Sequence, residues 1–226
     1  MADTALVIVA RYPQPGTTKT RLARVLGNEE TAQLYRAFLS DLAHRFAVQP
    51  AYDLHWAFTP AGVDYAEFMG SLAPALAHHM YFFPQRGMDL GDRLLHAFRW
   101  TFEHGYRRTI LIGSDSPHIC RSTIERAKDA LDEADVVLGP AEDGGYYLLA
   151  MHKPHDVFQN IPMSTNLVLQ MTIDLAQRQG LKVSTLETLF DVDELPELER
   201  LAQLLSADAS LAPATAAHLA TMKEFV

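Results

Sequence analysis

The feature that most constrains the fold is a regular alternation of short apolar runs with longer segments of helical periodicity. Residues 6–10 and 109–113 are continuous β-rich runs, as expected for strands buried on both faces. Strands that alternate with helices in this way predict a mostly parallel sheet covered on both sides. The 226 residues suit one such domain. We therefore expect an α/β fold, a three-layer αβα sandwich, formed by residues 1–226 as a single domain.

The same patterning gives the expected elements. Strands are expected over residues 6–10, 52–58, 80–83, 109–113, 136–138, 146–151 and 183–186. Helices are expected over residues 29–46, 65–69, 90–104, 122–131, 164–179, 194–205 and 213–225. Ser122 is the expected N-cap of the helix over residues 122–131. Gly180 is expected to end the helix over residues 164–179. Residues 139–145 join two strands without an intervening helix, which indicates a partly mixed sheet.

Composition excludes several classes of protein. The formal net charge of −9 disfavours a nucleic-acid-binding protein, which needs a basic face. No apolar run approaches the ~18 residues of a membrane span. The single cysteine, Cys120, cannot form an internal disulfide, so we expect a cytoplasmic protein. The sequence does not specify an oligomeric state.

Residues 11–22 follow the first expected strand and have the composition of a phosphate-binding loop. They combine Gly16, three threonines, Lys19 and Arg21, and both backbone amides and a following helix amino terminus favour anions. The order of residues matches neither a Walker A loop nor a dinucleotide-binding fingerprint. The alternative is a surface loop with a helix cap and two solvated cations.

Three further clusters carry acids or amides. Asp115 follows the strand at 109–113, and Asp191 and Asp193 alternate in an extended segment, so these carboxylates could hold Mg²⁺ or Mn²⁺. The alternative is that they cap nearby helices. Residues 142–145 place two acids before two glycines, which suits either a ligand contact or a hairpin turn. Gln85 could contact a base or sugar, or its segment could be a loop with Asp89 as a cap.

These clusters fall at the ends of expected strands, and in open α/β sheets ligands bind beyond the carboxyl ends of the strands. Basic groups from one loop and acids from two others together predict a site for a polyphosphate and a divalent metal ion.

The chain also resembles a known family, the bacterial DUF2064 proteins of the nucleotide-diphospho-sugar transferase superfamily. The resemblance rests on residues 9–22, 85–93, 113–117, 143–149, 164–165 and 191–193. These proteins are often labelled glycosyltransferases and are similar to phospholactate guanylyltransferases. The resemblance implies a GT-A-like fold in which Lys19 and Arg21 contact nucleotide phosphates. It implies that Asp115 is a metal ligand, with Asp191 or Asp193 as its partner.

Further site residues follow from the loop composition and the resemblance together. For the nucleotide we expect Ala10, Arg11, Gly16, Thr18, Lys19, Arg21, Gln85, Gly91 and Ser114. For the acceptor or sugar we expect Glu142, Asp143, Gly144 and Gly145. For catalysis we expect Lys19, Arg21 and Asp115.

The resulting hypothesis is a metal-dependent transferase that moves a nucleotidyl or glycosyl group from an NTP or nucleotide-sugar donor to a small acceptor. The cationic loop favours nucleotidyl transfer, because it suits a triphosphate, whereas the family label favours glycosyl transfer. The alternative from a different class is a non-catalytic, nucleotide-binding regulatory protein.

Overall fold

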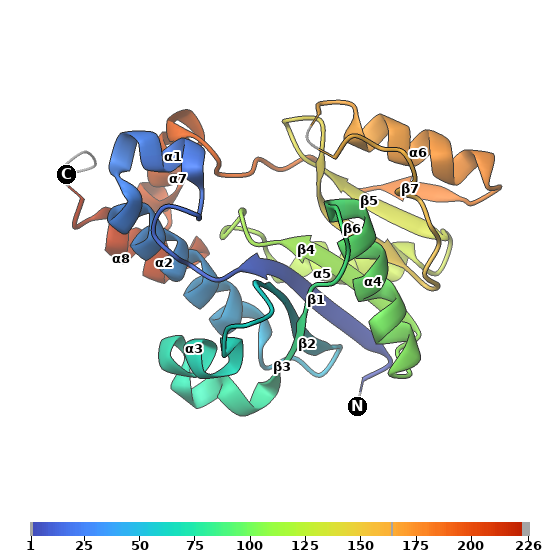
Figure 1. Cartoon of the computed structure of the whole chain (residues 1–226), viewed down its shortest axis with the longest axis horizontal. Helices are drawn as coiled ribbons and strands as arrows, with labels where there is room; N and C mark the ends of the chain where they lie inside the picture. Colours follow the sequence, from blue (N-terminus) through green and yellow to red (C-terminus); the bar gives the residue numbers. More distant parts are fainter. Residues whose placement is uncertain (1, 164, 223–226) are drawn as a thin grey trace.

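A computed structural model describes residues 2–163 and 165–222 of the chain (Figure 1). Its strands form one seven-stranded sheet. They are β1 (Thr4–Arg11), β2 (Asp53–Thr59), β3 (Met80–Pro84), β4 (Arg108–Gly113), β5 (Val136–Pro140), β6 (Tyr146–Met151) and β7 (Val183–Thr185). Each expected strand is present, with ends that differ by at most a few residues.

The α-helices are α1 (Thr20–Leu26), α2 (Asn28–Phe46), α3 (Tyr65–Leu72), α4 (Leu90–Glu103), α5 (Arg121–Ala130), α6 (Val168–Arg178), α7 (Leu195–Ala207) and α8 (Pro213–Leu219). A 3₁₀ turn, η1 (Pro74–His79), leads from α3 to β3, and a second, η2 (Ala209–Leu211), lies between α7 and α8. Among these residues, no helix has the length and apolar character needed to cross a membrane.

The strand order is β3-β2-β1-β4-β6-β5-β7. β1 pairs in parallel with β2 and β4, whereas β6 is antiparallel to both of its neighbours. The sheet is therefore mostly parallel and partly mixed, as the missing helix between residues 139 and 145 predicted. Because β1 and β4 are adjacent and parallel, the loops after Arg11 and Gly113 leave the sheet at the same edge.

Alternating side chains of the strands form two cores, which makes the fold a three-layer αβα sandwich. Leu6 and Ile8 of β1 face the core that contains side chains of α2, α3, α5, α7 and α8. Ala5 and Val7 face the core that contains side chains of α4 together with Ala176 of α6. The central strands are buried on both faces, which explains why they appear in the sequence as unbroken apolar runs.

Helix boundaries show where sequence patterns were insufficient. The N-cap of α5 is Cys120 and not Ser122, because Cys120 has the extended backbone of a cap (φ −97°, ψ 161°) while Ser122 already lies in the helix. α1 was not expected, since seven residues are too few to show a clear periodicity. Gly180 does follow α6 with a positive φ of 76°.

Two expected helices are shorter in the structure. α6 begins at Val168, because residues 165–167 form a turn in which the Thr165 hydroxyl donates to the Pro162 carbonyl. The expected start at position 164 lies outside the described residues. α8 ends at Leu219, and the expected end at position 225 also lies outside them.

Candidate active site

The loop after β1 is held in a compact turn by Thr18. The buried Thr18 hydroxyl accepts a hydrogen bond from the Gln14 amide (3.0 Å) and lies 3.1 Å from the Gln14 carbonyl. The turn ends at Lys19, whose φ of 43° places it in the left-handed region. That conformation costs a residue with a Cβ on the order of 1 kcal/mol. A strained backbone at a charged residue is a feature of functional sites.

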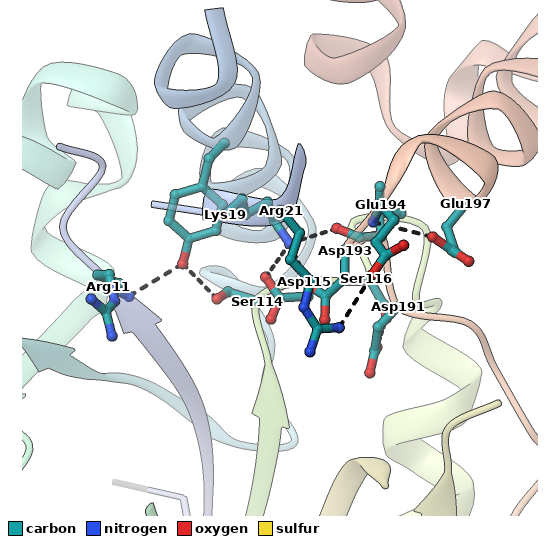
Figure 2. A network of polar contacts seen from close by, with 12 residues as sticks. Arg11, Lys19, Arg21, Ser114, Asp115, Ser116, Asp191, Asp193, Glu194 and Glu197 are labelled. Atoms are coloured by element: carbon teal, nitrogen blue, oxygen red, sulfur yellow. Dashed lines mark hydrogen bonds and ion pairs between the residues drawn. The ribbon is translucent and has the colours of Figure 1, made fainter. Parts of the chain in front are cut away.

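The strained backbone places the Lys19 ammonium group among acidic and carbonyl oxygens (Figure 2). Lys19 Nζ lies 2.5 Å from Asp115 Oδ1 and 3.3 Å from Asp193 Oδ1, and it donates to the Val192 carbonyl at 2.7 Å. Only 5% of the Lys19 side chain is exposed. Three segments that are far apart in the sequence therefore meet at one nitrogen atom.

The electrostatic balance keeps Lys19 charged. Burial alone would lower the pKa of Lys19, but the carboxylates of Asp115 and Asp193 outweigh it, so the pKa of Lys19 lies above its usual value. The rings of Tyr35 and Phe38 lie 5.8 and 5.6 Å from Nζ and form an apolar floor. Such a desolvated ammonium interacts more strongly with anions than one in water.

A carboxylate cluster surrounds this lysine. Ser116 donates a hydrogen bond to Asp191 Oδ1 (Figure 2). The Val192 amide also donates to the Asp115 carbonyl at 2.9 Å, so the two loops are tied together. Burial, joined by repulsion from Asp115, Asp193 and Asp143, raises the pKa of Asp191 to about 7, although the Ser116 hydrogen bond opposes the change. The cluster thus has excess negative charge that Lys19 only partly offsets.

The oxygen atoms of this cluster have the chemistry of a divalent metal site. Its oxygens suit Mg²⁺ or Mn²⁺, and Asp115 and Asp193 already converge on one cationic atom, Lys19 Nζ. Across residues 2–163 and 165–222, however, no three His, Cys, Asp or Glu side chains are grouped so as to hold a metal. The oxygen atoms suit such an ion, but the three carboxylates are not close enough together in this structure to hold one. The metal role of Asp115, Asp191 and Asp193 therefore stays a prediction.

Tyr35 of α2 is a site residue that sequence reasoning missed. Its hydroxyl lies 2.6 Å from Ser114 Oγ and accepts a hydrogen bond from the Arg11 amide at 3.2 Å. Burial, and then the Asp115 carboxylate, raise the pKa of Tyr35 to about 12, so the hydroxyl stays protonated. In the sequence, Tyr35 is one more large residue beside an apolar helix face, and no local pattern marks it as polar.

Cavities open around the cluster. A cavity of about 460 Å³ is lined by Arg21, Asp143, Gly145, Asp191 and Asp193, among others. A second, of about 250 Å³, is lined by residues that include Ala10, Arg11, Thr18, Lys19, Tyr35, Gln85, Ser114 and Asp115. A third, of about 410 Å³, is lined by Arg11, Thr17, Lys19, Thr20, Arg21 and Asp193. Asp193 lines all three, so they meet at the carboxylate cluster.

The other basic residues of the loop are exposed. Arg21 has 65% of its side chain exposed and forms a 3.4 Å ion pair with Glu194 (Figure 2). Arg11 is also exposed and donates to the Thr17 carbonyl at 3.3 Å. Both arginines line cavities that Lys19 or Asp193 also lines, so their guanidinium groups stand at the rim of the site.

Three expected nucleotide contacts have structural roles. Gln85 lines the second cavity, but its amide nitrogen already donates to the carbonyls of Ala10 (3.0 Å) and Ala57 (2.8 Å). Gly91 is buried in α4, where an added Cβ would lie 3.0 Å from Phe158. Gly16 supplies a positive φ of 80° in the loop and lies near Asn28, and it lines none of the three cavities.

The expected acceptor segment is divided. Asp143 and Gly145 line the first cavity, where Asp143 Oδ1 accepts from the Gly145 amide at 2.8 Å. Glu142 instead forms an ion pair with Arg200 of α7 (2.7 Å). Gly144 packs so closely against Asn166 that a Cβ at position 144 would lie only 2.2 Å from the Asn166 carbonyl oxygen.

Comparisons with solved structures define the class of fold. A proposed nucleotide-diphospho-sugar transferase from Desulfovibrio desulfuricans G20 is 33% identical, with 100% of this chain and 97% of that chain covered and a TM-score of 0.90. CMP:2-keto-3-deoxy-manno-octonic acid synthetase, complexed with CTP, is 15% identical, with 91% and 99% covered and a TM-score of 0.51. The 4-diphosphocytidyl-2C-methyl-D-erythritol synthase of Anaerococcus prevotii DSM 20548 is 7% identical, with 90% and 96% covered and a TM-score of 0.58.

The fold is therefore that of the nucleotidyltransferase and nucleotide-diphospho-sugar transferase group. Residues 42–165 match the family described as an uncharacterized protein conserved in bacteria (DUF2064). The chain belongs to this family, as the sequence motifs indicated. No protein of curated function matches the sequence.

Proposed function

We propose that this protein is a transferase that uses a nucleotide donor, and that it transfers a nucleotidyl group to a small acceptor. The observation that carries the proposal is the placement of the Lys19 ammonium, buried between Asp115 and Asp193, because Lys19 lines two of the three cavities and Asp193 lines all three. A fixed cation at the carboxyl ends of parallel strands suits the phosphates of a donor. It would also offset the charge that grows on them during transfer.

The donor is proposed to lie along the loop after β1. Its phosphates would occupy the third cavity, where Lys19, Arg21 and Arg11 supply three cationic groups. Charge-assisted hydrogen bonds of this kind each contribute about 1.5–3 kcal/mol. The nucleoside would then extend into the second cavity, beside Ala10 and Ser114.

Asp115, Asp191 and Asp193 would hold Mg²⁺ or Mn²⁺ when the donor is bound. A divalent ion supplies further neutralisation of phosphate charge and orients the donor. Lys19 Nζ pairs with Oδ1 of Asp115 and Oδ1 of Asp193, so the other oxygens of these carboxylates would hold the ion while Lys19 stays in place. The acceptor is proposed to enter the first cavity, on the side of Asp143 and Gly145.

Glycosyl transfer is a second candidate, supported by the nucleotide-diphospho-sugar transferase name of the 33%-identical relative. The two reactions differ in product. Attack of an acceptor phosphate on the α-phosphorus of an NTP breaks the bond to the β-phosphate oxygen and releases pyrophosphate. Attack of an acceptor on the sugar carbon of a nucleotide-sugar releases a nucleoside diphosphate.

The test is to incubate the full chain with Mg²⁺ or Mn²⁺ and either each NTP plus a pool of sugar phosphates or each nucleotide-sugar plus a pool of small acceptors, and to follow pyrophosphate and nucleoside diphosphate. We expect release with one NTP, and its loss in Lys19→Ala but not in the matched control Lys128→Ala on α5. If nucleoside diphosphate appears from a nucleotide-sugar and pyrophosphate never does, the glycosyl alternative replaces the proposal. Binding of nucleotides without any product would favour a regulatory protein.

A further inference from the structure

Arg200 of α7 is a charged residue to which the function proposed above gives no role. Its Nη1 atom donates to both carboxylate oxygens of Glu142, at 2.9 and 2.7 Å. Its Cζ atom also lies over the ring of Phe190, 4.1 Å from the ring centroid. Arg200 lines none of the three cavities of the candidate active site, so we do not expect it to touch a substrate.

The contact with Glu142 holds the turn after β5. The next residue, Asp143, lines the first cavity. The Glu142 amide donates to the Leu189 carbonyl at 3.0 Å, and the Leu189 amide donates back to the last carbonyl of β5 at 3.0 Å. The turn and the segment that leads to Asp191 therefore run side by side, and Arg200 contacts both of them from α7.

The contact with Phe190 holds the segment that carries the late acids. Phe190 is 6% exposed and immediately precedes Asp191. The ring of His118, from the loop after β4, stacks on Phe190 with 4.3 Å between the ring centroids. Two groups that lie this close to one centroid must occupy opposite faces of the ring. Phe190 is therefore held between the loop after β4 and Arg200.

These contacts should contribute little to the stability of the fold. The side chains of Arg200 and Glu142 are 53% and 50% exposed, and an exposed ion pair is weakened by water and salt. A cation over an aromatic ring is also a weak contact where the cation is exposed. Their main effect is geometric, because one side chain fixes the turn that carries Asp143 relative to the segment that carries Asp191.

We propose that Arg200 is a positioning residue for the acceptor side of the active site. Through its two contacts it sets the separation of the Asp143 and Asp191 carboxylates, which both line the first cavity. The inference rests on the proposed function, in which that cavity receives the acceptor. The described loop after β1 makes no hydrogen bond or ion pair with Arg200, so donor binding should not depend on it.

A kinetic test compares Arg200→Met with the control Arg178→Met, which changes an exposed arginine of α6. The acceptor is the compound that gives product in the assay described above. Because a distant substitution that displaces a site by about 1 Å can cost up to about 100-fold, we expect the KM for the acceptor to rise roughly tenfold in Arg200→Met. The dissociation constant of the donor, measured by titration, should change less than about twofold. Equal weakening of donor and acceptor, or an unchanged KM, would overturn the proposal.

The pair with Glu142 allows a second kinetic test. Arg200→Lys keeps a cation for both contacts and should retain most of the affinity for the acceptor. Glu142→Gln should raise the KM for the acceptor by no more than Arg200→Met does. The variant with both Arg200→Met and Glu142→Gln should be no worse than Arg200→Met alone, because the two side chains act through one contact. Additive losses would mean that Glu142 meets the acceptor by itself, and the positioning role would be wrong.

Amide hydrogen exchange tests the positioning without turnover. The amides of Glu142 and Leu189 join the turn to the late segment, and in Arg200→Met we expect them to exchange about 5- to 10-fold faster. Amides of the buried strand β1 should exchange as in the unaltered chain. If the unaltered chain forms no product from any donor, the proposed function fails, and exchange alone then decides the role of Arg200. Unchanged exchange at both amides would rule that role out.

Discussion

Lys19 and Arg21 are two residues apart, yet they stand in opposite environments. Lys19 has 5% of its side chain exposed and contacts two carboxylates and a carbonyl, whereas Arg21 is 65% exposed and has one partner, Glu194, at 3.4 Å. An exposed ion pair contributes about 0–1 kcal/mol, and a buried one is costly to break because an uncompensated charge stays behind. The comparison shows that this basic motif contains a fixed cation, Lys19, which buried contacts hold in place. It also contains an adaptable cation, Arg21, which is exposed to solvent and free to change its partner.

The largest expected effect is on metal dependence. Asp115→Asn removes a charge that contacts the buried lysine and, in our proposal, holds the metal ion. We expect the Mg²⁺- or Mn²⁺-dependent part of nucleotide affinity to disappear in this variant, as measured by calorimetric titration with and without the ion. Unchanged affinity in the presence of metal would remove Asp115 from the proposed metal site.

Lys19→Ala tests the fixed cation directly. Loss of one charge-assisted contact of about 1.5–3 kcal/mol should weaken triphosphate binding by roughly 10- to 100-fold. Nucleoside binding should change little, because a nucleoside has no phosphate. Titrations of both ligands against the same preparation would check this, and equal losses for the two would contradict a phosphate-binding role.

A buried histidine on β2 also predicts that the folded state loses stability in acid. His55 is 2% exposed, and burial lowers its pKa to about 4 from 6.5. Since the unfolded state takes up the proton first, stability should fall as the pH drops from about 6.5 to about 4, by up to about 1.4 kcal/mol per pH unit. Denaturant melts at several pH values would measure the slope. It should decrease in His55→Gln but not in a variant of the exposed His104.

The smallest effect is expected for Arg21→Ala. Because the Glu194 pair is exposed, the free energy of unfolding should change by less than about 1 kcal/mol. Triphosphate affinity should fall less than in Lys19→Ala, as the same titrations would report. If Arg21→Ala were instead the more damaging of the two, the distinction between fixed and adaptable cations would be wrong.

Much of the fold could be predicted from the sequence, because strands that are buried on both faces need apolar side chains at almost every position. Such strands therefore appear as unbroken apolar runs. Residues 6–10 and 109–113 predicted β1 and β4, and the missing helix after residue 138 predicted the mixed sheet. Helix ends were less predictable. The start of α5 depends on the backbone of Cys120, which residue preferences do not encode.

The candidate site was accessible only in outline. Strand ends indicated that Lys19, Asp115 and Asp193 should share an edge, and the structure brings these three side chains together. Tyr35 escaped notice because its polar role depends on a tertiary contact with Ser114. Glu142 was expected to face an acceptor, but its pairing with Arg200 depends on how α7 packs, and a local sequence pattern carries no information on that.

The contact between Lys19 Nζ and the Val192 carbonyl joins positions 173 residues apart. Such closure belongs to the slow, non-local part of a folding reaction. During synthesis, the strained turn at Lys19 leaves the ribosome long before the oxygens that stabilise it exist. A nascent chain that stops short of Asp193 lacks part of the group of oxygens that holds Lys19 in place. We therefore expect the ability to bind phosphates to arise late in synthesis, once the segment with Asp193 has docked.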